Sequence, residues 1–247
     1  MTTPPARWLD LRRHTPARVA LGRAGNAQPT AAHLDFQQAH AAARDAVHAA
    51  LNVEALREAL GTETIQVSSA APDRRTYLLR PDLGRRLAEG EVSRLPSLPG
   101  CFALVICDGL SATAIQRHAA PFVRALLPAL TPPLAPIIIA TQGRVALGDP
   151  IGEALGAEAV CVLIGERPGL TSPDSMGAYL TWRPRRGRTD AERNCISNIR
   201  PDGLPPATAA AKLVWLIAEM RRLRLTGVRL KDEEPRLGSG SESLHIE

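Results

Sequence analysis

Aromatic residues are scarce in this 247-residue chain, at 3% of the total, so Ala, Leu, Val and Ile must fill most of any core. Long apolar runs are missing as well, since no stretch reaches the ~20 residues that a membrane-spanning helix needs. The first residues, MTTPPARWLDLRRH, lack the apolar core of a secretory signal peptide. These absences predict a protein that crosses no membrane and works in the cytoplasm.

Close cysteine pairs are also absent. The four cysteines are Cys101, Cys107, Cys161 and Cys195, and no two of them form a C-x-x-C motif. Zinc sites and redox pairs commonly use that spacing, so the sequence predicts neither, and no metal ligands are assigned. Three of the four lie in apolar runs, which is typical of small buried side chains in a reducing compartment.

Basic residues exceed acidic ones, 30 Lys+Arg against 25 Asp+Glu, which gives a formal net charge of +5. Almost all of the basic residues are Arg, which suits phosphates, carboxylates and protein interfaces. GC-rich coding is the other explanation for their abundance. No long Lys/Arg run with interleaved aromatics occurs, so we do not expect nucleic-acid binding.

The N-terminal part of the chain has the character of short helices joined by loops. Residues 31–51 and 54–60 are expected to be helical, with Thr30 as an N-cap for the first and Gly61 as the C-cap of the second. Residues 66–69 favour a strand or a loop, and 81–89 a short helix. We therefore predict an arginine-rich arm and a small helical N-terminal domain over residues 1–98.

The character changes after Gly100. Apolar runs at 101–107, 136–140 and 159–164, with a further short run at 179–182, alternate with expected helices at 111–130, 149–155 and 205–225. Short apolar runs between helices indicate βαβ units and a parallel sheet covered on both faces. The fold class predicted for residues 99–231 is therefore α/β, a Rossmann-like parallel sheet domain. Residues 232–247 are polar and rich in Gly and Ser, and we expect them to be disordered.

Ligands of open parallel sheets bind beyond the carboxyl ends of the strands. The segment DGLSAT at 108–113 follows the first apolar run there, and it suits either an anion site or plain helix capping. It lacks the second glycine of G-x-S-x-G, so a serine hydrolase is not predicted.

Two further polar segments follow later strands. GERPGL at 165–170 has neither the P-loop nor the G-x-G-x-x-G signature, and we favour a binding role over an Arg–Glu pair that only fastens the loop. The segment DAERNCISNI at 190–199 offers amides that recognise other polar groups. No His lies near Cys195 in sequence, which argues against a nucleophilic cysteine.

Six segments, in order along the chain, resemble the small (light) subunit of ethanolamine ammonia-lyase. The matching segments are LRRHTPARVALGRAG at 11–25, LDFQQAHAAARDAVH at 34–48, DGLSATAIQRHA at 108–119, GRVALGDPIGEALGA at 143–157, VLIGERPGL at 162–170 and ERNCISNIRP at 192–201. The resemblance implies an adenosylcobalamin-dependent enzyme that converts ethanolamine to acetaldehyde and ammonia. A large TIM-barrel subunit would bind the substrate, and cobalamin would lie between the two subunits.

The resemblance also implies what this chain does within the hetero-oligomer. It would hold no catalytic residue and be inactive alone, and the enzyme would sit in the cytoplasm, either free or inside a bacterial microcompartment. The cofactor contacts implied for this chain are Val145, Glu166 and Cys195. The motif R-V-A-L-G occurs at 18–22 and again at 144–148, and the second copy stands at the family's spacing before Glu166.

The chemistry of these residues agrees with that role. Glu166 offers acceptor oxygens for the amides around a corrin ring, Val145 offers backbone groups beside a small apolar side chain, and Cys195 offers a weakly polar sulfur rather than a cobalt ligand. Two alternatives stay open: a structural assembly subunit with incidental cofactor contact, and a stand-alone nucleotide-binding protein.

Overall fold

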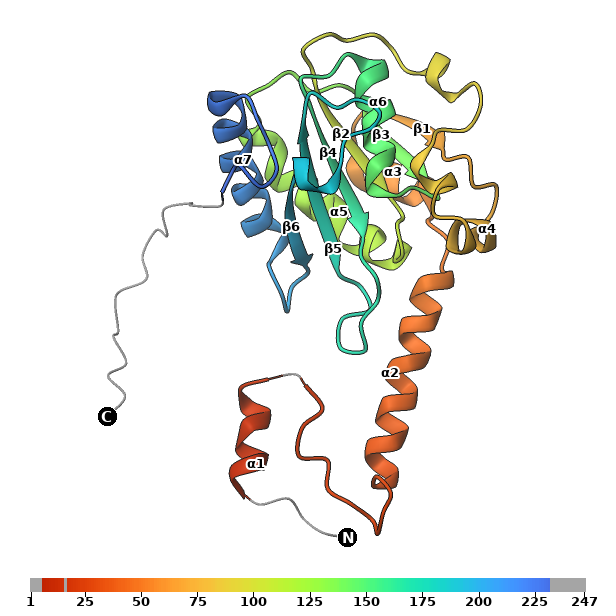
Figure 1. Ribbon diagram of the computed structural model, residues 1–247, viewed down its shortest axis with the longest axis vertical. Coiled ribbons are helices and arrows are strands. Elements are labelled where there is room, and N and C mark those ends of the chain that lie inside the picture. The colour runs from red at the N-terminus through yellow and green to blue at the C-terminus, as the bar shows by residue number, and fades with distance from the viewer. Residues whose placement is uncertain (1–5, 16, 232–247) are drawn as a thin grey trace, which may run out of the picture.

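The computed structural model describes residues 6–15 and 17–231 (Figure 1). The tail predicted to be disordered, 232–247, lies outside the described residues. Six strands form one sheet in the order β1-β3-β2-β4-β5-β6. The first four pair in parallel, whereas β5 and β6 are antiparallel. The strands are β1 Thr64–Ser68, β2 Phe102–Cys107, β3 Ile137–Thr141, β4 Ala159–Gly165, β5 Met176–Trp182 and β6 Arg193–Ile199.

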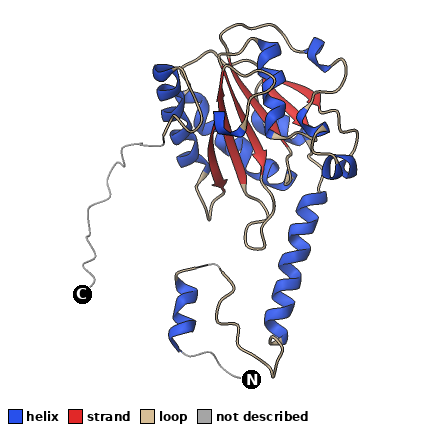
Figure 2. Cartoon of the chain, viewed as in Figure 1, coloured by secondary structure: helices blue, strands red, loops and turns tan. Residues whose placement is uncertain are grey.

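Helices cover both faces of this sheet (Figure 2). Along β2, Phe102 and Leu104 point into a core cluster shared with α3 Val53–Leu60, α5 Ala112–Leu126 and α7 Pro206–Leu223. The residues between them, Ala103 and Val105, point into a second cluster shared with α6 Gly148–Leu155. Alternate residues of one strand therefore meet two buried layers, which explains why β2 is apolar throughout. The predicted α/β class is confirmed, but the sheet is mixed and mostly parallel rather than wholly parallel as predicted, since β5 and β6 pair antiparallel.

The sheet differs from the prediction at both edges. Strand β1 lies before residue 99 and pairs with β3, Thr64 opposite Ile137, so the sheet begins earlier than expected. Strand β6 was not predicted. Its residues alternate between buried and exposed, with only Arg193, Ile196 and Ile199 buried, so it lacks the apolar run of an interior strand.

The small helical domain predicted for residues 1–98 is not confirmed as a unit. Helix α3 and strand β1 join the body of the molecule, whereas α2 Thr30–His48 extends away from the sheet (Figure 1). Ala46 is the only fully buried residue of α2. The division at residue 98/99 therefore stays a prediction.

Two local predictions were wrong. Thr30 is the first residue of α2 rather than its N-cap, and the capping position is Pro29, whose ring cannot accept a hydrogen bond. Residues 81–89 form one 3-10 turn, η2 Leu83–Arg85, because the chain at Arg86 turns to an extended conformation. The remaining short helices are α1 Ala6–Asp10, η1 Leu11–Arg13, α4 Arg74–Leu79, η3 Glu91–Arg94, η4 Leu127–Ala129, η5 Val145–Leu147 and η6 Asp190–Glu192.

Candidate functional site

The three predicted site residues lie on the α6 side of the sheet. Val145 opens η5 after β3 and packs against the same core cluster as Tyr179 of β5. Cys195 of β6 stands directly opposite Tyr179, and Tyr179 stands opposite Val162 of β4, which belongs to that cluster. Directly opposed side chains in a sheet point to one face. Glu166 follows β4 at its carboxyl end, and its charge acts on both Tyr179 and Cys195.

The Glu166 carboxylate is held by Ser175, which directly precedes β5, and by Asn198 near the end of β6. The Ser175 hydroxyl donates to Oε2, and the Asn198 N–H donates to the same oxygen at 3.3 Å. Asn198 reaches it from an irregular end of the β5–β6 pairing, with a φ of 57°. A carboxylate can accept about four hydrogen bonds. Glu166 is only half-buried, so it keeps acceptor capacity toward solvent or a ligand.

Gly177 makes room for that carboxylate. A Cβ atom at this position would lie 2.9 Å from Glu166 Oε1 and 3.1 Å from Tyr179 Cε2. Any side chain here would therefore displace the acceptor oxygen. The space beside Glu166 depends on the absence of a side chain, which sequence reasoning did not single out.

Cys195 is a neutral thiol in this setting. Cys195 is exposed as a residue, but the protein atoms around its sulfur desolvate the thiolate and raise the pKa of the thiol. The hydrogen bond from the Tyr179 hydroxyl partly offsets this, and the Glu166 charge raises the pKa further. The same surroundings raise the pKa of Tyr179, with burial as the main cause. A thiol that keeps its proton is a poor nucleophile and a poor metal ligand. The interpretation of Cys195 as a packing and contact residue fits this geometry.

Val145 stands at the edge of a basic groove. The groove has a volume of about 420 Å³ beside η5. Next to Val145, the Arg144 guanidinium stacks on the Tyr77 ring at 4.2 Å, and the backbone N–H of Arg144 donates to the Gly84 carbonyl at 2.8 Å. The residues that line the groove are Arg85, Arg144, Val145, Ala146, Arg188, Thr189 and Asp190.

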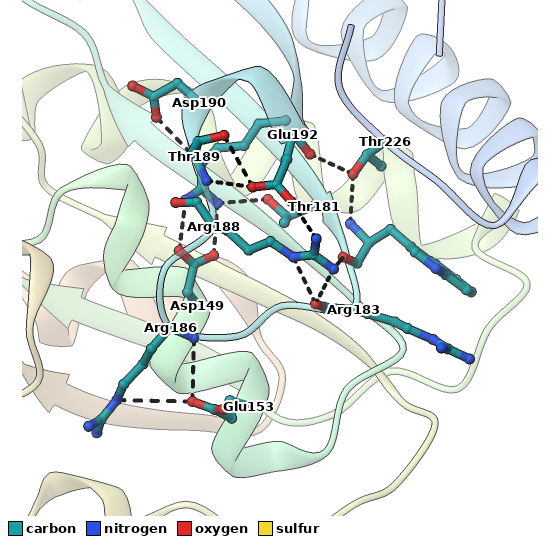
Figure 3. A network of polar contacts seen from close by, with 12 residues as sticks. Asp149, Glu153, Thr181, Arg183, Arg186, Arg188, Thr189, Asp190, Glu192 and Thr226 are labelled. Atoms are coloured by element: carbon teal, nitrogen blue, oxygen red, sulfur yellow. Dashed lines mark hydrogen bonds and ion pairs between the residues drawn. The ribbon is translucent and has the colours of Figure 1, made fainter. Parts of the chain in front are cut away.

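A buried ion pair ties α6 to β6 beneath this surface. Asp149, in the first turn of α6, accepts from Arg193 at 2.8 and 2.7 Å, and Arg193 also donates to Thr181. Figure 3 shows how the network continues through Arg188 and Glu192 in the β5–β6 connection. Asp149 lies four residues after Val145, and Arg193 lies two residues before Cys195. The network therefore fixes η5 and α6, next to Val145, relative to β6, which carries Cys195.

The polar residues of the DGLSAT segment, the other candidate at a strand end, make hydrogen bonds within the fold. Ser111 caps α5: its hydroxyl accepts from the Ala114 N–H at 3.2 Å and donates to the Pro173 carbonyl. Asp108 is buried and accepts from the Gly109 and Gly143 N–H groups, so the DGLSAT segment already holds its own anion. Within residues 6–15 and 17–231, no group of His, Cys, Asp and Glu is arranged to hold a metal ion.

Sequence reasoning missed Ser175, Tyr179 and Arg85. Tyr179 was expected only as part of a strand, and its position opposite Cys195 depends on the pairing of β6. Ser175 follows a turn that brings it back against Glu166, nine residues away in sequence, and no motif marks it. The arginine abundance was the one signal that could have indicated Arg85.

These features define an α/β protein with a six-stranded, mostly parallel sheet that has Val145, Glu166 and Cys195 on its α6 side. In the part of the chain that the structure describes, no helix is long and apolar enough to cross a bilayer.

Comparisons with known proteins identify the family. Residues 5–231 match the family described as ethanolamine ammonia-lyase light chain (EutC). The ethanolamine ammonia-lyase small subunit of Azotobacter vinelandii is 56% identical over 238 residues, covering 92% of this chain and 88% of the relative. That of Xanthomonas campestris pv. campestris is 51% identical over 257 residues, covering 98% and 94%. The chain belongs to the ethanolamine ammonia-lyase light chain family, as the resemblance predicted.

Proposed function

We propose that this chain, as the small subunit of an ethanolamine ammonia-lyase, forms one wall of the enzyme's adenosylcobalamin pocket. The enzyme is a carbon–nitrogen lyase that depends on this cofactor and converts ethanolamine to acetaldehyde and ammonia. The proposal assigns the cofactor contacts to Val145, Glu166 and Cys195, and no catalytic residue to this chain. The observation that carries it is the Glu166 carboxylate, fixed at the open end of the sheet with acceptor capacity left.

The residues present fit the chemistry of the cofactor. A corrin ring is a broad apolar surface fringed by amides, so it needs an apolar wall and hydrogen-bond acceptors at its edge. Tyr179, Val145 and the neutral thiol of Cys195 offer the wall, and Glu166 accepts from amide N–H groups. When bound, adenosylcobalamin supplies the organic radical that starts the reaction. This chain's residues orient the ring and exclude water from one side.

The partner is the large subunit, a TIM barrel according to the resemblance, and the N-terminal arm is the proposed contact. The arm comprises residues 6–48. It carries exposed apolar side chains, which usually mark an interaction surface when they gather in one segment. We place the enzyme in the cytoplasm, either free or inside a bacterial microcompartment. The exposed apolar residues of the arm are Trp8, Leu9, Leu11, Leu34 and Phe36.

The alternative is an assembly subunit whose contact with the cofactor is incidental. The experiment that separates the two is Glu166→Gln in the complex with a co-expressed large subunit. We expect cobalamin affinity to fall about tenfold to a hundredfold, the cost of losing a charged hydrogen-bond acceptor. Acetaldehyde production should fall with cofactor occupancy, while recovery of the complex stays unchanged.

Glu58→Gln is the matched control, because Glu58 is an exposed carboxylate on α3, which packs on the opposite face of the sheet. It should leave affinity and activity at the wild-type level. If Glu166→Gln changes the recovery of the complex instead of cofactor affinity, the assembly role is correct and the proposed contact is wrong.

A further inference from the structure

A groove rich in arginine runs beside Val145, outside the three residues assigned above. It consists of two adjoining hollows of about 440 and 420 Å³ that share Arg85, Ala146 and Arg188. Its walls come from η2, from η5 with the start of α6, and from the β5–β6 connection. Five guanidinium groups line it, those of Arg85, Arg86, Arg144, Arg186 and Arg188.

Two of these guanidinium groups are available to a ligand. Arg188 is engaged by Glu192. Among the described residues, Arg85 forms no ion pair or side-chain hydrogen bond. Arg144 is half-buried, and in the described residues its side chain donates one hydrogen bond, from Nη2 to the Tyr77 carbonyl at 3.3 Å.

The other charges of the groove do not cancel this excess. Arg86 lies 3.5 Å from Asp82, and Arg186 lies 4.0 Å from Glu153. The acidic residues that line the groove, Asp149 and Asp190, share one arginine, Arg193, so one carboxylate charge remains to set against the two charges of Arg85 and Arg144. The groove therefore keeps a positive charge beside Val145.

Arg144 is held in place at the part of the groove that it lines together with Arg85. Arg144 stacks on Tyr77, whose hydroxyl donates to the Gly143 carbonyl at 3.0 Å. Gly84 lies close against the Arg144 side chain, since a Cβ atom at position 84 would lie 2.9 Å from Arg144 Cγ. The backbone bond from Arg144 to Gly84 therefore places Arg85, the next residue, at the side of Arg144. The Arg144 guanidinium, fixed in this way, loses little conformational freedom when it binds an anion.

We propose that Arg85 and Arg144 bind the phosphodiester of the nucleotide tail of cobalamin. This inference rests on the proposed function, because it extends the same site from the corrin ring to its tail. The tail carries one negative charge, and guanidinium groups hold phosphate oxygens by paired, charge-assisted hydrogen bonds. Arg144 directly precedes Val145, so the anion site adjoins the edge assigned to the ring. The groove is concave, so it suits the nucleotide tail that extends from the corrin ring better than it suits a flat surface of a partner protein.

The test compares two ligands that differ in the tail. The complex of this chain with its large subunit is titrated with cyanocobalamin and with dicyanocobinamide, which has the corrin ring but no nucleotide. For Arg85→Gln we expect the Kd of cyanocobalamin to rise about tenfold to a hundredfold, as for the loss of a charged hydrogen bond. The Kd of dicyanocobinamide should not change. Arg144→Gln should act in the same direction, with circular dichroism as a check on its fold.

Arg222→Gln is the matched control, since Arg222 is an exposed arginine on α7 that pairs with Glu219. It should leave both dissociation constants unchanged. Equal weakening of the two ligands by Arg85→Gln, or no weakening of either, overturns the proposal. Loss of the large subunit from the Arg85→Gln complex assigns the groove to the partner and also overturns it. If the wild-type complex binds neither ligand, the proposed function itself fails.

Discussion

The position of the Glu166 carboxylate depends on a few individual neighbouring residues. Its oxygens are placed by Ser175, by Asn198 and by the missing side chain of Gly177. Ser175 and Gly177 are not marked in the sequence, and Asn198, which lies in the DAERNCISNI segment, reaches Glu166 with its backbone N–H rather than with its side-chain amide. The resemblance indicated Val145, Glu166 and Cys195 by matching motifs, but a motif cannot show which neighbours hold an acceptor in place. That information depends on the pairing of β5 with β6.

Gly177→Ala should weaken cobalamin binding without unfolding the protein. The new methyl group would push the flexible end of Glu166 away from its present position, which costs little folding free energy. The dissociation constant of cobalamin from the two-subunit complex should rise severalfold. In a Glu166→Gln background the same substitution should add little, because the two changes act on one carboxylate. Additive effects in this double-mutant cycle would show that Gly177 acts independently of Glu166.

At the scale of elements, the buried Asp149–Arg193 pair joins α6 to β6. Asp149→Asn would leave the Arg193 charge buried with a weaker partner, so we expect a loss of about 3–5 kcal/mol in the free energy of unfolding. Asp190→Asn is the control, because Asp190 pairs with the same arginine but its side chain is 99% exposed. It should cost within about 1 kcal/mol. Urea unfolding measures both, and equal losses would contradict the assigned role of the buried pair.

The connection between β5 and β6 should respond to acid through Glu192. Its pKa is lowered from 4.5 to about 2, first by the Thr189 N–H and then by Arg188. A carboxylate with a lowered pKa in the folded state stabilises the fold above its unfolded pKa and loses that contribution as the pH falls. The stability gap between wild type and Glu192→Gln should therefore shrink between pH 4.5 and 2. A gap that is the same in urea melts at pH 6 and pH 3 would contradict this.

The elements themselves were predictable where burial is complete. The interior strands β2, β3 and β4 lie within a residue or two of the predicted apolar runs, because both of their faces are covered. Gly61 ends α3 in the left-handed conformation, as expected of a C-cap glycine. The edge strands were not predictable in this way, since β1 and β6 are only partly buried and mix polar with apolar residues.

The whole molecule combines a sheet domain with an arm that lies apart from it. Beyond its own short contacts, such as Arg18 with Asp35, the arm meets the body where the Arg74 side chain donates to the Val47 carbonyl at 2.7 Å. Leu34 and Phe36 of α2 are exposed, away from the sheet domain. The sequence predicted an arm but also a separate helical domain, because a helical pattern does not reveal what a helix packs against.

Replacing both Leu34 and Phe36 by Ser should reduce assembly with the large subunit while the thermal stability of this chain alone stays within a few degrees. Both side chains are exposed, so their loss removes no core contact. Co-purification of the two subunits measures the effect. The matched control is Leu79→Ser, since Leu79 is 68% exposed and lies on α4, outside the arm. Equal assembly by both variants would show that the arm is not the contact.

We propose that Val145, Glu166 and Cys195, on the α6 side of this chain's sheet, form half of a cobalamin pocket and that the large subunit forms the other half. Equilibrium titration of cyanocobalamin against this chain alone, the large subunit alone and the reconstituted pair measures what each half contributes. We expect tight binding by the pair and at least a hundredfold weaker binding by this chain alone, about 2.7 kcal/mol in binding free energy. If either subunit alone binds cyanocobalamin as tightly as the pair does, the divided pocket is wrong.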